Sequence, residues 1–105
     1  MQIVSPAELE EMLRNGPEPR LIDVRDPWEY ELCRIGGSKN IPMGEFMGQI
    51  DTLNKDDAVV VICHHGMRSG QVAAYLDSLG YTKVMNLEGG VDAWSRTVDP
   101  AMPQY

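Results

Sequence analysis

The sequence predicts an α/β domain with a mainly parallel sheet and helices on both of its faces, formed by residues 1–105 as one unit. Short apolar segments alternate along the chain with segments of helical spacing, the pattern of strand–helix–strand units. Segment 58–63 is apolar at consecutive positions, as a strand buried on both faces requires. A chain of 105 residues with 43% hydrophobic residues suits a single domain with an ordinary core.

The first half of the chain is expected to contribute two helices and two strands. Segment 5–8, Ser-Pro-Ala-Glu, is a capping box with proline at the first helical position, and it predicts a helix to about residues 15–16. Segment 20–24 follows a Pro/Gly-rich turn and is partly β-branched, so we expect a strand. Segment 26–29, Asp-Pro-Trp-Glu, is a second capping box that predicts a short helix. Residues 39–41 form a weak strand, stopped by Pro42.

The second half is expected to hold the centre of the sheet. Residues 43–53 have loosely helical spacing, and 58–63 is the predicted central strand. Residues 69–79 form one apolar helical face with Gly80 as a C-terminal stop. Residues 83–87 form another strand, after which a Gly-Gly turn leads into a last helix that carries the core residue Trp94. The seven methionines are expected to fill gaps in the core.

Charge and composition exclude several classes of function. The net charge of −7 and a pI near 4.6 mean that the molecule repels a phosphate backbone, so we expect no nucleic-acid partner. No apolar run approaches the ~20 residues that span a bilayer, and no signal peptide is visible, so we expect no membrane association and a cytoplasmic location. Two cysteines, Cys33 and Cys63, are fewer than a disulfide-framed scaffold carries, which indicates a reducing compartment with a working thiol.

Cys63 follows the most buried of the predicted strands. Ligands of parallel α/β sheets bind outside the carboxyl ends of strands, where Cys63 lies. The loop after it, with His64, His65, Gly66, Met67, Arg68 and Ser69, joins that strand to a helix. Loop N–H groups and a helix N-terminus stabilise a thiolate and any anion built on it, Gly66 lets the loop curl, and Arg68 offers a cation to an anionic donor. The alternative is a buried structural cysteine.

Four fragments together resemble a single-domain rhodanese. They are Asp23-Val24-Arg25 with Glu29 and Tyr30, segment 37–42, segment 61–69 and segment 87–94. The resemblance implies a rhodanese-like fold and a sulfurtransferase in which Cys63 carries sulfur as a persulfide, held by the amides of the loop and the Ser69 hydroxyl. It implies thiosulfate or a persulfide as donor and cyanide or a thiol as acceptor, with a sulfur-carrier or thioredoxin-type protein as one candidate partner. No metal or organic cofactor is required. Around Cys33 the sequence departs from the family pattern, because a histidine expected there is absent.

Other interpretations of the same residues stay open at this stage. Cysteine-dependent phosphatases and arsenate reductases of similar fold have a Cys-x5-Arg loop, whereas this chain has Cys63-x4-Arg68 with Ser69 at the next position. A non-catalytic binding module is a further alternative. The side chains of His64 and His65 are expected to point in different directions, which disfavours a metal site; His65 either contacts substrate or faces solvent, and Met67 could offer an apolar wall to an acceptor. Asp23 and Arg25 are expected to form a buried structural pair that fixes the loop with Glu29, and Cys33 either packs in the core or acts as a resolving thiol.

Overall fold

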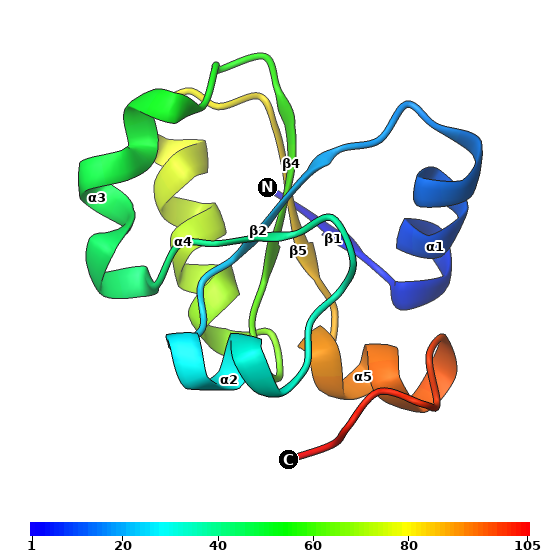
Figure 1. Cartoon of the computed structure of the whole chain (residues 1–105). Helices are drawn as coiled ribbons and strands as arrows, with labels where there is room; N and C mark the ends of the chain where they lie inside the picture. Colours follow the sequence, from blue (N-terminus) through cyan, green and yellow to red (C-terminus); the bar gives the residue numbers. More distant parts are fainter.

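One sheet of five parallel strands forms the centre of the protein (Figure 1). The computed structural model describes residues 1–105, with strand order β1-β5-β4-β2-β3. Every pairing is parallel. The strands are β1 (Gln2–Val4), β2 (Arg20–Asp23), β3 (Lys39–Asn40), β4 (Ala58–Ile62) and β5 (Lys83–Leu87). The predicted fold class is confirmed, and β4 is the central strand.

The chain forms five α-helices, and the two that have predicted capping boxes begin where those boxes predict. The helices are α1 (Pro6–Asn15), α2 (Pro27–Leu32), α3 (Phe46–Gln49), α4 (Met67–Ser78) and α5 (Gly90–Thr97), with short 3-10 helices η1 (Met43–Glu45) and η2 (Ile50–Thr52) on either side of α3. Ser5 and Glu8 exchange both hydrogen bonds of a capping box at the start of α1. At the start of α2 the Glu29 carboxylate accepts the Asp26 N–H at 3.1 Å.

Three expectations about these elements need correction. The strand β1 was not predicted, because it is short, lies at the edge of the sheet and leaves Ile3 63% exposed, so it has no apolar pattern of its own. The helix α4 begins at Met67 rather than at residue 69, since Gly66 adopts a left-handed φ of 102° as its N-cap. The methionines fill the core only in part: Met102 is buried and Met12 and Met85 pack against the same core, whereas the other four are exposed.

The side chains of β4 and of the following Cys63 alternate between two hydrophobic cores. Helices α3 and α4 cover one face of the sheet, and α1 and α5 cover the other (Figure 1). Val59, Val61 and Cys63 belong to the core under α3 and α4, whereas Val60 and Ile62 belong to the core under α1 and α5. All five side chains have no exposed surface. The run of apolar residues that predicted this strand therefore serves both faces of the sheet.

Parallel pairing brings three strand ends to one edge of the sheet. Asp23 is opposite Ile62, and Asn86 is opposite Val61, so the loops after β2, β4 and β5 leave the sheet side by side. Helix α2 and the C-terminal stretch lie at this same edge (Figure 1). No helix has the length and apolar character needed to cross a bilayer.

Candidate active site

The Cys63 sulfur lies at the carboxyl end of β4, and two hydrogen-bond donors face it. The backbone N–H of Gly66 donates to Sγ at 3.0 Å, and the Ser69 hydroxyl lies 3.3 Å from it. Gly66 can turn this N–H toward the sulfur because its φ of 102° belongs to the left-handed region. Cys63 has no exposed surface, but its sulfur is held by polar groups rather than sealed in hydrocarbon.

Asn86 of β5 braces the loop from the neighbouring strand. Its side-chain amide donates to the Gly66 carbonyl at 3.0 Å, and its Oδ1 accepts the Ser69 hydroxyl. Ser69 has one hydroxyl hydrogen and faces two acceptors, Asn86 Oδ1 and Cys63 Sγ. When Cys63 is a thiolate, that hydrogen is the second donor available to the sulfur. The sequence analysis did not identify Asn86 as a site residue. The signal that could have indicated it is a polar residue near the carboxyl end of a predicted strand.

The first residues of α5 donate backbone hydrogen bonds to the start of the Cys63 loop. Val91 N–H donates to the Cys63 carbonyl at 2.9 Å, and Asp92 N–H donates to the His64 carbonyl at 3.0 Å. This approach needs a glycine at position 90, because a Cβ built there would lie 2.2 Å from the Cys63 oxygen. The Gly-Gly turn expected before the last helix therefore fixes the backbone at Cys63.

Arg68 is held by Glu29 of α2. The two Nη groups donate to the two carboxylate oxygens at 2.7 and 2.9 Å, a bidentate pair. These hydrogen bonds hold the pKa of the Glu29 carboxyl at about 2, against the opposing effect of burial. The same hydrogen bonds raise the pKa of Arg68. The sequence suggested Arg68 as a cation for an anionic donor, but here its charge is matched by a carboxylate.

Arg25 and Asp23 form a second, fully buried ion pair near the Arg68–Glu29 pair, which we call the Arg68 clamp. The Nε and Nη2 atoms of Arg25 donate to the Asp23 carboxylate at distances of 2.7 to 3.0 Å, and neither side chain is exposed. Arg25 also donates to the carbonyls of Glu29 within α2 and of its C-cap residue Cys33, which ties the segment after β2 to α2. The link to Glu29 runs through its main-chain carbonyl, whereas the Glu29 carboxylate pairs with Arg68.

His64, His65 and Tyr105 form a stack of three rings. The His64 ring lies 3.9 Å from that of His65 and 3.8 Å from that of Tyr105, the latter almost parallel at 9°. The expectation that the two histidines point apart is wrong. Burial lowers the pKa of His64, and the neighbouring His65 lowers it further, which favours the neutral ring.

Two histidines and Asp92 bring their potential metal-ligand atoms within 4.8 Å of one another. The two rings are stacked with an angle of 30° between their planes. Asp92 is paired with Arg96 at 3.2 Å. A metal at this cluster would therefore compete with Arg96 for the Asp92 carboxylate.

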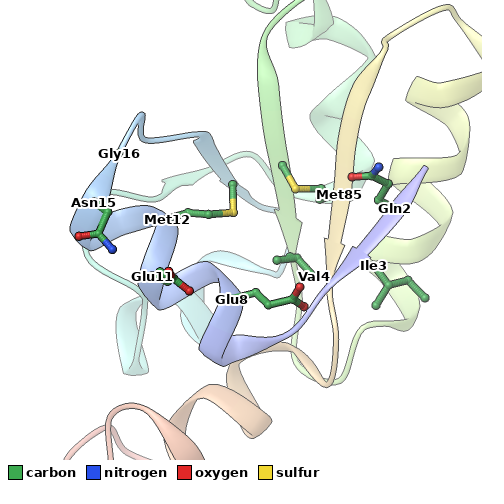
Figure 2. A pocket seen from close by; sticks show the side chains of 9 residues that line it. All are labelled: Gln2, Ile3, Val4, Glu8, Glu11, Met12, Asn15, Gly16 and Met85. Atoms are coloured by element: carbon green, nitrogen blue, oxygen red, sulfur yellow. The ribbon is translucent and has the colours of Figure 1, made fainter.

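The two cavities of the molecule lie away from Cys63. One, of about 530 Å³, lies between β1, the middle of β5 and α1, where Figure 2 shows Met12 and Met85 directed toward the same space. The other, of about 160 Å³, lies between the α3 region and α4. The chemistry of Cys63 is therefore that of a loop nest rather than of a deep pocket.

Comparison with known proteins identifies the family. The model of the Rhodanese-like domain matches residues 5–97. The chain belongs to the rhodanese-like family. A Bacillus subtilis protein named as a sulfurtransferase, YtwF, is 40% identical over 97 residues, which cover 92% of this chain and 93% of that protein. Thiosulfate sulfurtransferase GlpE of Pseudomonas paraeruginosa is 35% identical over 100 residues, with 95% and 88% covered.

The chain is also similar to a much longer protein and to solved structures. The chain spans 26% of a Mycobacterium tuberculosis protein named as an adenylyltransferase/sulfurtransferase, MoeZ, to which it is 34% identical over 97% of its own length. The rhodanese-like domain protein of Staphylococcus aureus superposes with a TM-score of 0.86 at 28% identity, covering 100% of this chain and 99% of that one. A Rhodopseudomonas palustris protein described as a possible tyrosine phosphatase superposes with a TM-score of 0.82 at 26% identity, covering 100% and 85%.

The structure brings the predicted loop residues of this rhodanese-like domain together but gives them different surroundings. Cys63, Gly66 and Ser69 share hydrogen bonds around the sulfur, and Arg68 turns toward α2. Met67 is 78% exposed on the rim. Cys33 is buried in the core on the opposite face of the sheet, where its sulfur also accepts from Arg25 Nη1 at 3.7 Å.

Proposed function

We propose that the protein is a sulfurtransferase that carries sulfane sulfur on Cys63. The observation that supports this most directly is the pair of donors, Gly66 N–H and the Ser69 hydroxyl, that face the Cys63 sulfur at the carboxyl end of the central strand. Donors at this position stabilise the thiolate, which is the nucleophilic form of cysteine. The family membership and the names of its relatives point in the same direction.

The proposed reaction has two displacement steps. The Cys63 thiolate attacks the outer sulfur of thiosulfate or of a persulfide, a new S–S bond forms on Cys63, and the donor's own S–S bond breaks with its electron pair leaving on sulfite or on a thiolate. In the second step a thiolate or cyanide attacks the outer sulfur of the Cys63 persulfide. The S–S bond to Cys63 then breaks and the thiolate returns. The two donors, Gly66 N–H and the Ser69 hydroxyl, stabilise the sulfur anion in both steps.

Intact-mass spectrometry tests this proposal. Incubation with thiosulfate, or with an alkyl persulfide, should add one sulfur atom to the protein, and cyanide should remove it as thiocyanate. Cys63→Ala should lose the adduct, whereas Cys33→Ala should keep it as the matched control, because Cys33 lies in the opposite core. If neither thiosulfate nor the alkyl persulfide gives an adduct, the result would favour a non-catalytic binding module.

A phosphatase is the second candidate, because one structural neighbour is described as a possible tyrosine phosphatase. The geometry argues against it: the arginine of the loop is clamped by Glu29, and Ser69 stands where a Cys-x5-Arg loop has its arginine. Hydrolysis of an aryl phosphate that disappears in Cys63→Ala would support this alternative.

A further inference from the structure

Asn86 holds both of the residues that donate hydrogen bonds to the Cys63 sulfur. Those donors are the Gly66 N–H and the Ser69 hydroxyl, which lie 3.0 and 3.3 Å from Sγ. Asn86 Nδ2 donates to the Gly66 carbonyl at 3.0 Å, and Asn86 Oδ1 accepts from the Ser69 hydroxyl. One carboxamide on β5 is therefore bonded to each residue that faces the sulfur.

The Asn86 amide also packs closely against the start of α4. A Cβ built on Gly70 would lie 3.3 Å from Nδ2, and one built on Gly66 would lie 3.9 Å from it. The Gly66 carbonyl accepts the Gly70 N–H at 3.1 Å as well, in the hydrogen bond with which α4 begins. Asn86 therefore fixes the first turn of α4 together with its N-cap Gly66.

The partners of Asn86 determine the orientation of its amide group. A main-chain carbonyl can only accept, so the amide nitrogen faces Gly66 and the amide oxygen faces Ser69. The amide oxygen also only accepts, so the Ser69 hydroxyl is the donor of that pair. While Asn86 holds this single hydrogen, the hydroxyl presents lone pairs to the sulfur. This arrangement suits a neutral thiol, whose S–H can donate to those lone pairs.

We propose that Asn86 is a positioning residue that controls the second donor to the Cys63 sulfur: it holds the Ser69 hydrogen while Cys63 is a thiol and yields it to the thiolate. A thiolate is a charged acceptor and attracts the hydrogen more strongly than a neutral amide oxygen does. The exchange needs only a rotation of the hydroxyl. The role of Asn86 in sulfur transfer rests on the proposed function, whereas its effect on the ionisation of Cys63 does not.

Asn86→Asp tests this role, because it keeps the size of the side chain and replaces the amide by a carboxylate. The carboxylate would hold the Ser69 hydrogen more firmly than an amide oxygen, and it would face the Gly66 carbonyl without a hydrogen to donate. Its charge would also disfavour a neighbouring thiolate. The rate of Cys63 alkylation by iodoacetamide, plotted against pH, should therefore have its midpoint about one pH unit or more above that of the wild type.

The shift must depend on Ser69 if Asn86 acts through that hydroxyl. In a Ser69→Ala background there is no hydroxyl hydrogen to capture, so Asn86→Asp should shift the midpoint by roughly half a pH unit less than when Ser69 is present. Equal shifts in the two backgrounds would show that the carboxylate acts only through its charge, and they would overturn the proposal. An unchanged midpoint in Asn86→Asp would do the same.

Asn86→Leu provides a second test without a new charge. Of the two acceptors that face the Ser69 hydroxyl, only Cys63 Sγ then remains. Ser69→Ala should accordingly raise the midpoint by more in the Asn86→Leu background than in the wild type. Effects of equal size would contradict the proposal even if Asn86→Asp does not fold.

Two controls separate positioning from loss of structure. Lys83→Ala changes an exposed residue of β5 and should leave the midpoint unchanged. Cys33 lies buried in the opposite core, so peptide mapping should find it unmodified wherever the domain stays closed. The other charged or titratable groups around the loop are the same in all variants; they are Glu29, His64, His65, Arg68 and Asp92. Because alkylation needs only the thiol, the result is independent of whether thiosulfate or a persulfide yields a sulfur adduct.

Discussion

The Glu29 carboxylate links α2, the Cys63 loop and Tyr105. Replacing it with glutamine therefore tests how much these contacts contribute to the stability of the fold. The substitution preserves size but removes the negative charge that accepts both Nη groups of Arg68 and the Tyr105 hydroxyl. The carboxyl has a pKa of about 2 in the folded protein against an ordinary value of 4.5. One pKa unit is worth about 1.4 kcal/mol, so ionised Glu29 contributes on the order of 3 kcal/mol to folding at neutral pH.

The pH dependence of this contribution has a definite sign. A carboxyl with a depressed folded-state pKa stabilises the fold fully above its ordinary value of 4.5, and the contribution disappears as the pH falls toward 2. Wild type and Glu29→Gln should therefore differ by about 3 kcal/mol in the free energy of unfolding at pH 7. The difference should shrink steadily below pH 4.5, because every other carboxyl is common to both proteins.

Urea unfolding followed by tryptophan fluorescence measures this difference at a series of pH values. Glu31→Gln is the matched control: it changes an exposed glutamate on the same helix and should shift the midpoint little at any pH. A gap between wild type and Glu29→Gln that is as large at pH 3 as at pH 7 would refute the linkage argument. So would the absence of a gap at pH 7.

Three further outcomes are expected. Gly90→Ala should destabilise the protein by more than about 2 kcal/mol in urea unfolding, because its φ of 59° is left-handed and the new Cβ would lie 2.2 Å from the Cys63 oxygen; Gly36→Ala, with open space at its Cβ, should be tolerated. Ser69→Ala should slow persulfide formation on Cys63 by about tenfold in stopped-flow experiments, because one donor to the sulfur anion is lost; an unchanged rate would show that Gly66 N–H suffices. Val60→Ala should cost about 2 kcal/mol with an unchanged urea m-value, since it opens a cavity at a residue with no exposed surface.

The sequence predicted best those elements whose signals are local. The capping residues of α1 and α2 lie within the segments that they begin, and the apolar run of β4 is itself the evidence for burial on both faces. The strand β1 gave no such signal, because it is stabilised by pairing with β5 at the far end of the chain. A three-residue edge strand carries too few positions for a periodic pattern.

The residues of the candidate site also fall into those with a local sequence signal and those without one. Cys63 and its loop were predicted because a strand end followed by glycine, arginine and serine is a contiguous pattern. Asn86 and Tyr105 were not, since each reaches the loop from an element distant in sequence. The partner of Arg68 was also outside the reach of the sequence: the choice between a free cation and a clamp by Glu29 depends on where α2 lies.

The side chains of the two cysteines pack in hydrophobic cores on opposite faces of the sheet. Cys63 belongs to one core and Cys33 to the other, and both are reduced. A disulfide needs the two side chains to face each other, and side chains that belong to cores on opposite faces of the sheet do not. Under the proposed reaction, the acceptor that removes sulfur from Cys63 is then a thiol, cyanide or another nucleophile other than Cys33.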